Sequence, residues 1–232
     1  GIPSSSSHAL VGGLCGSAFR FGGISVVQWN GLTKKVLIPL VASPTTGFLL
    51  GGLVMVLIAK LVGHCHPGRI GGWFRRLQVF SAAFMALSHG QNDAQKSMGI
   101  ITLGLFSLDY IHTKAVPPWV MFACALAMAL GTSAGGWRII KTMGHRIIRL
   151  DPVHGFAAET SAASVITAAS VLGMPVSTTH VIAGSIFGVG AAQRLSAVRW
   201  RVALSMVTAW VTTLPASFLL GAIGYDVFRW IG

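Results

Sequence analysis

Residues 173–185 of the chain read GMPVSTTHVIAGS, and residues 1–13 read GIPSSSSHALVGG. The two stretches align without a gap. Glycine, proline, serine, histidine and glycine recur in register, and hydroxyl residues occupy both positions before each histidine. A glycine and a proline at this spacing can recur by chance in a glycine-rich chain, but a hydroxyl run and a histidine would rarely follow. We interpret the pair as an internal repeat.

Each copy carries residues that begin a helix and keep its first turn polar. Proline is tolerated near a helix start, where its missing N–H removes no hydrogen bond. Serine and threonine cap the free backbone N–H groups, and the helix dipole adds a partial positive charge at the same end. Such an end binds anions. We therefore expect the helices that follow Pro3 and Pro175 to present anion-binding ends.

The composition is that of a membrane protein. Hydrophobic residues make up 53% of the 232 residues and charged residues only 9%, against roughly 25% charged in an ordinary soluble domain. This excludes a water-soluble globule, and the formal net charge of +12 does not indicate a nucleic-acid binder, because the polar surface that such a protein needs is missing. Three cysteines far apart in the sequence predict neither a disulfide framework nor a metal centre.

Seven apolar stretches predict helices that cross or enter a bilayer, which for this length has room for roughly six to eight spans. They cover residues 9–27, 36–62, 77–106, 119–136, 156–172, 181–192 and 202–224. Pro44, the polar residues 89–93 and Pro215 fall within three of them and predict broken helices. If each run crosses once, three of the four basic clusters lie on one side of the membrane, as the positive-inside tendency requires.

The same crossing count makes the helices after Pro3 and Pro175 run in opposite directions. The predicted fold class is therefore an all-α integral membrane protein, an inverted-repeat secondary transporter with broken or re-entrant helices. Residues 1–75 would hold the remainder of the first repeat and a connecting span, and residues 76–232 the second repeat.

A polar cluster at residues 88–97, SHGQNDAQKS, stands between two strongly apolar stretches. Charged residues at membrane depth are expensive, so Asp93 and Lys96 are candidates for a functional site. Three residues apart, they share one helical face and partly neutralise each other. The alternative is a short polar loop at the membrane surface, with Lys96 reaching out to the lipid headgroups.

Together these motifs resemble the inorganic phosphate transporter (PiT) family of secondary carriers. That family carries in each half a Gly-x-Asn-Asp motif and a later Gly-x-Pro-x-Ser-Thr-Thr-His motif. The second half of this chain shows both, at residues 90–93 and 173–180, whereas the first half shows only residues 1–8. The resemblance implies that the other Asn-Asp motif precedes residue 1, so we expect the chain to be an N-terminally incomplete piece of a larger transporter.

The resemblance also implies roles for individual residues. Asn92 and the hydroxyl residues of both repeats would bind phosphate, and Asp93 would bind the coupling ion. The Asp-x-Gln-Lys form that ends at Lys96 is similar to the bacterial low-affinity branch, which is associated with proton coupling and with neutral metal–phosphate complexes. A proton is therefore favoured over sodium as the coupling ion, and no other cofactor is expected. The hydroxyl residues are Ser5, Ser6, Ser7, Ser177, Thr178 and Thr179.

Several alternatives remain open from the sequence. Glu159 either supplies a second acidic group for the cation or is a carboxylate in the first turn of its helix. Sulfate or another tetrahedral oxyanion would suit the same hydroxyl donors, and sodium would suit the same carboxylate. An intramembrane hydrolase built on Ser177, His180 and Asp93 is disfavoured, because catalysis needs one nucleophile and this site offers six hydroxyls, so we expect no enzyme.

The expected location is the bacterial inner membrane, which the chain would cross several times. The expected partners are phosphate, the coupling cation and lipid, with no nucleic acid. Whether the protein forms a homodimer stays open.

Overall fold

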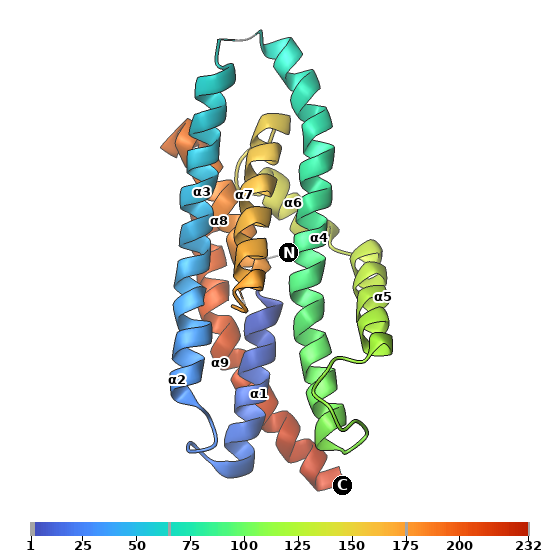
Figure 1. Ribbon diagram of the computed structural model, residues 1–232. Helices are drawn as coiled ribbons and strands as arrows, with labels where there is room; N and C mark the ends of the chain where they lie inside the picture. The colour runs from blue at the N-terminus through green and yellow to red at the C-terminus, as the bar shows by residue number, and fades with distance from the viewer. Residues whose placement is uncertain (1–2, 65, 175, 232) are drawn as a thin grey trace.

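The computed structural model describes residues 3–64, 66–174 and 176–231, and these ranges contain helices and no strand (Figure 1). Each of the seven predicted apolar stretches falls largely within a helix, and Pro175 lies outside the described residues. The α-helices are α1 (Ser6–Gly22), α2 (Trp29–Leu32), α3 (Ile38–Val62), α4 (Pro67–Ser107), α5 (Pro118–Ala134), α6 (Trp137–Lys141), α7 (Pro152–Val171), α8 (Thr178–Gln193) and α9 (Trp200–Ile231). Thr33–Leu37 and Thr142–Arg146 are short π-helical segments, and Leu195–Ala197 is a 3-10 helix.

Two helical stretches of the described chain are long and apolar enough to cross a membrane, Trp29–Val62 with 34 residues and Trp200–Ile231 with 32 residues. A third span is added if α5 and the helix after it, Trp137–Arg146, count as one segment bent by 63°. With 17 and 16 residues, α1 and α8 are shorter than the about 20 residues that a full crossing needs. They therefore suit segments that enter the membrane without crossing it alone.

The breaks predicted at Pro44, at residues 89–93 and at Pro215 were wrong, because α3, α4 and α9 are each continuous through them. A proline inside a membrane helix is tolerated where nearby hydroxyl groups bond the carbonyls around it. Beside Pro44, the Thr45 hydroxyl donates to Val41 O at 2.7 Å. In α4 the backbone stays helical, and the polar side chains find partners on other elements instead.

The two hydroxyl motifs lie at the middle of the molecule (Figure 1). From there α1 runs toward one end and α8 toward the other, while α7 and α8 form a helical hairpin whose connection also lies at mid-level. The long helix α4 lies beside α7, and α5 packs on the outer side of α4. The structure thus brings residues that are about 170 positions apart in the sequence to one place. The proposed division at residue 75 stays a prediction.

The closest helix pairs, α3 with α8 and α1 with α9, cross at glycines. A β-carbon on Gly188 would clash with the carbonyl of Phe48, and one on Gly16 would clash with the carbonyl of Phe218. Gly16 and Gly188 lie three positions after the ends of the two copies of the repeat and correspond to each other in the same register. Small residues at such crossings let two backbones approach closely inside a membrane.

We expect Gly188→Val to lower the melting temperature of the purified protein clearly. The new side chain must push two backbones apart, and overpacking of this kind costs about 2 kcal/mol. The matched control is Gly131→Ala in α5, where a β-carbon meets nothing within 4 Å and alanine is favoured over glycine by about 1 kcal/mol in a helix. An equal melting temperature for the wild type and Gly188→Val would contradict the close crossing.

Candidate functional site

The two hydroxyl motifs start their helices in the same way. Ser5 Oγ accepts a hydrogen bond from the His8 backbone N–H at 3.2 Å, and Ser177 Oγ accepts one from the His180 backbone N–H at 3.3 Å. Both serines are buried. The repeat seen in the sequence is therefore also a repeat of local structure, with a serine cap at each helix start.

Aromatic rings join the two helix starts. The rings of His8 and His180 have centroids 4.8 Å apart, and the His180 ring stacks on Trp210 of α9 at 4.0 Å. Trp210 Nε1 donates to Pro3 O at 3.2 Å, so its indole also fixes the chain before α1. All three rings are buried, as expected of packing residues.

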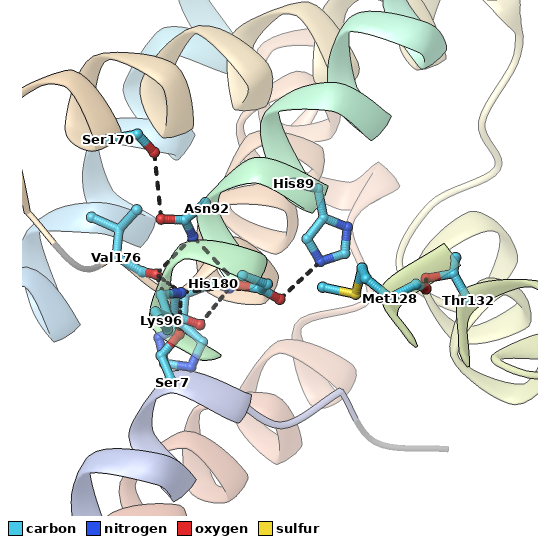
Figure 2. Close-up of polar contacts among 11 residues, drawn as sticks. Ser7, His89, Asn92, Lys96, Met128, Thr132, Ser170, Val176 and His180 are labelled. Atoms are coloured by element: carbon cyan, nitrogen blue, oxygen red, sulfur yellow. Dashed lines mark hydrogen bonds and ion pairs between the residues drawn. The ribbon is translucent and has the colours of Figure 1, made fainter. Parts of the chain in front are cut away.

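Lys96 links α4 to both hydroxyl motifs (Figure 2). Its ammonium donates to Ser7 Oγ at 2.5 Å, to Asp93 Oδ1 at 2.9 Å and to Val176 O at 3.0 Å. The side chains of Asp93 and Lys96 are each only 14% exposed. The alternative of a polar loop with Lys96 reaching the headgroups was wrong, since Lys96 points into the protein from a continuous helix.

Asn92 lies next to this group and uses both ends of its amide. Asn92 Nδ2 donates to Val176 O at 3.3 Å, and Asn92 Oδ1 accepts a long hydrogen bond of 3.5 Å from the Ser170 hydroxyl on α7. Its side chain is buried. Asn92 therefore fixes α4 against the end of α7 and against the residue before the Ser177 cap.

The other carboxylate oxygen of Asp93 contacts His89. His89 Nε2 lies 3.3 Å from Asp93 Oδ2, and the His89 side chain is 44% exposed. His89 lines a cavity of about 870 Å³ between α4 and α5, together with Met128 and Thr132 (Figure 2). Asp93 thus pairs with Lys96 through one carboxylate oxygen and contacts His89, a residue that lines the cavity, through the other.

Comparison with known proteins identifies the family. The family model described as "Phosphate transporter family" matches residues 1–70 and 64–221 of the chain. The chain belongs to this family. The resemblance found in the sequence is therefore confirmed.

Bacterial members of the phosphate transporter family are similar to the chain over nearly its whole length. The "Probable low-affinity inorganic phosphate transporter" of Rhizobium meliloti (strain 1021) is 50% identical, over 97% of this chain and 67% of its own length. The proteins of the same name from Bacillus subtilis (strain 168) and Mycobacterium tuberculosis (strain ATCC 25618 / H37Rv) are both 44% identical over the whole chain, which spans 69% and 56% of their lengths.

A solved structure, "The sodium-dependent phosphate transporter", has the same fold. It matches with a TM-score of 0.89 over 99% of this chain and 74% of its own chain. The identity is 23%, so the likeness concerns the fold. The helical fold of this family member is thus one that a known phosphate transporter also adopts.

The structure brings most of the predicted site residues of this family member together. Ser7, Asn92, Asp93 and Lys96 meet directly or through Val176 O. The remaining hydroxyl residues lie at the two helix starts: Ser5 and Ser177 are buried as caps, Thr178 is buried, Thr179 is partly exposed and Ser6 is exposed.

Glu159 lies apart from these residues. It accepts a hydrogen bond of 2.5 Å from the Ser81 hydroxyl, and Ser81 precedes Asn92 on α4 by eleven positions, about 16 Å along a helix. Glu159 is the eighth residue of α7, so the interpretation as a carboxylate in the first helical turn was wrong. Among the described residues, no group of three His, Cys, Asp or Glu side chains is placed to hold a metal ion.

Sequence reasoning missed two residues of the site, His89 and Trp210. His89 stands four positions before Asp93, a spacing that predicts contact once α4 is taken as one helix. Trp210 stands in the middle of an apolar run, whereas most other tryptophans stand at segment ends. That position was the available signal for a tryptophan with a role inside the protein.

Proposed function

We propose that this protein is a secondary transporter that carries inorganic phosphate across the bacterial plasma membrane together with a proton. The observation that carries the proposal is the meeting of two serine-capped helix starts beside Lys96 and Asp93. The names of the family relatives support phosphate as the substrate.

The net charge around the two helix starts, Lys96 and Asp93 suits a phosphate monoanion. Each helix start contributes about half a positive charge. Lys96 and Asp93 pair at 2.9 Å and neutralise each other. About one positive charge is then left unbalanced, which matches dihydrogen phosphate better than the sulfate dianion. The hydroxyls at both helix starts and the free backbone N–H groups supply donors, so no arginine is needed.

Asp93 is the candidate for the coupling proton. Its Oδ2 atom faces His89 at the edge of the cavity, while Oδ1 stays paired with Lys96. A proton that arrives by way of His89 can therefore reach Oδ2 while Oδ1 keeps its contact with Lys96. Glu159 is a second acidic group on α7, bonded to Ser81. It remains a candidate second acidic group for the coupling cation, apart from the Asp93–Lys96 pair.

The paired glycine crossings support an inverted repeat. In the α3–α8 pair, Gly184 lies against Pro44 O, and in the α1–α9 pair, Gly12 lies against Leu214 O. Gly12 and Gly184 are equivalent positions of the repeat, and α1 and α8 point in opposite directions (Figure 1). An inverted repeat that holds the substrate between its copies is a transporter architecture.

A hydrolase is disfavoured by the same contacts. A serine nucleophile needs a base whose side chain reaches its hydroxyl. Ser177 Oγ instead accepts a hydrogen bond from the His180 backbone N–H, and the His180 ring stacks on Trp210. These contacts favour a binding role for Ser177 over a role as an activated nucleophile.

Uptake of labelled phosphate by liposomes that contain the full-length protein tests the proposal. We expect uptake to rise when a proton gradient points inward and to persist in a large excess of sulfate. Empty liposomes are the control. Strong competition by sulfate would contradict the phosphate assignment, and uptake unaffected by the proton gradient would contradict proton coupling.

A further inference from the structure

The ammonium of Lys96 sits in a cage of three oxygen atoms, which we call the oxygen cage: Ser7 Oγ, Asp93 Oδ1 and Val176 O, at 2.5, 2.9 and 3.0 Å from Nζ. The atoms come from α1, from α4 and from the residue before the Ser177 cap of α8. A hydroxyl, a carboxylate and a backbone carbonyl are the kinds of oxygen that bind hard metal cations in proteins. In transporters, backbone carbonyls at unwound segments and helix ends coordinate coupling cations.

The contacts show that Lys96 is not placed as a phosphate ligand. An ammonium has three N–H groups and no acceptor, and all three oxygens of the cage lie within hydrogen-bond reach of Nζ. Ser7 and Val176 are buried, and the Lys96 side chain is 14% exposed. The Lys96 ammonium therefore donates its hydrogen bonds to protein oxygens, and it affects a bound anion only through the electrostatic field of its charge.

The cage also requires a positive charge. Asp93 is largely buried beside Lys96, and a carboxylate left there without a cation would be costly. His89 contacts the opposite oxygen of Asp93 and lies at the cavity edge. The Lys96 ammonium occupies the position between all three cage oxygens. If the ammonium were removed, the three oxygen atoms would surround a site with a net negative charge.

We propose that Lys96 is a tethered cation: its ammonium occupies the oxygen cage in place of a free monovalent metal ion, and so makes phosphate transport by this protein independent of sodium. The inference deepens the proposed function, since it names the residue that decides the coupling cation. Sodium dependence does occur in this fold, since the similar solved structure is that of a sodium-dependent phosphate transporter.

Two substitutions of Lys96 separate an empty cage from a filled one. Lys96→Ala removes the ammonium and leaves the three oxygens, whereas Lys96→Met fills a similar volume without charge. Lys35→Ala, at an exposed lysine, is the matched control. The first measurement is the melting temperature of the purified full-length protein in sodium chloride and in N-methylglucamine chloride at equal concentration, without phosphate, since a cation that binds only the folded protein stabilises it.

We expect sodium to raise the melting temperature of Lys96→Ala and to leave the wild type, Lys96→Met and Lys35→Ala unchanged. In liposomes, we expect phosphate uptake by Lys96→Ala to rise about fivefold or more with sodium, the lower end of ordinary coupling between two ligands. If Lys96→Ala does not fold, Lys96→Ser takes its place, with a hydroxyl oxygen added to the cage.

Two results would overturn the inference. One is a wild type that sodium stabilises as much as it stabilises Lys96→Ala, and the other is a folded Lys96→Ala or Lys96→Ser that does not respond to sodium. Sodium stabilisation of the variant in a protein that takes up no phosphate would refute the proposed function and support the tethered cation. Phosphate uptake by the wild type, with no effect of sodium on the folded variant, would support the proposed function and refute the tethered cation.

Discussion

Replacing Asp93 by Asn is expected to reduce phosphate uptake to the level of empty liposomes. The substitution keeps the shape of the side chain and an oxygen near Lys96, but it removes the charge that pairs with the ammonium at 2.9 Å. It also removes the oxygen that can take up and release a proton beside His89. Breaking a buried ion pair by removing one partner costs about 3–5 kcal/mol, so stability must be measured together with uptake.

The double variant Asp93→Asn with Lys96→Met separates stability from coupling. It removes both charges, so it should melt closer to the wild type than Asp93→Asn alone and still show no uptake. The matched control is Asp226→Asn, which breaks the exposed pair with Arg20 at 2.7 Å and should cost at most about 1 kcal/mol with uptake retained. Wild-type uptake by Asp93→Asn would refute the coupling role.

The sequence predicted where most helices lie along the chain, although not their continuity, and it predicted that the two hydroxyl motifs meet. Apolar runs of helical length placed α1, α3, α4 and α9 close to where they lie, because a chain in a bilayer must satisfy its backbone hydrogen bonds within each segment. The repeat with a histidine after each hydroxyl run indicated two like helix starts, and the serine caps of His8 and His180 lie where that repeat puts them.

The continuity of α4 could not be predicted in the same way. Residues 89–93 look like an interruption in the sequence because polar residues occur together in an apolar region. In the structure their backbone stays helical. Asp93 contacts His89 and Lys96 on the same helix, and Asn92 has partners far away in the sequence. Val176 O accepts from both Asn92 and Lys96. Every residue has a backbone carbonyl, so nothing in the sequence indicates that the carbonyl of Val176 is the acceptor for these two side chains.

The phosphate-binding role of Ser7 stays a prediction, and the structure adds contacts that the sequence did not indicate. Its hydroxyl was predicted to bind phosphate, and in the structure it accepts from Lys96 and donates to Val176 O at 3.4 Å. Ser6, at the next position toward the helix start, is exposed. If phosphate binds as proposed, we expect the exposed Ser6 hydroxyl to be more accessible to it than the Ser7 hydroxyl, which already contacts Lys96 and Val176 O.

Replacing Trp210 by Ala is expected to have the largest effect on stability. The indole stacks on His180 at 4.0 Å and donates to Pro3 O at 3.2 Å, so it holds α8, α9 and the chain before α1 together. It is buried, and truncating a buried aromatic side chain to alanine costs about 3–5 kcal/mol. The loss should appear as a lower melting temperature of the full-length protein in detergent.

Two further variants show which part of the indole matters. Trp210→Phe keeps a ring against His180 and loses the bond to Pro3 O, so it should recover most of the stability, with a remaining loss of about 1 kcal/mol. Trp230→Ala removes a tryptophan whose surface is 89% exposed and should leave the melting temperature unchanged. If Trp210→Ala melts like Trp230→Ala, the helix starts are held by other contacts. If it melts lower and its phosphate affinity falls with it, the stack also fixes the geometry in which the two helix starts face the anion.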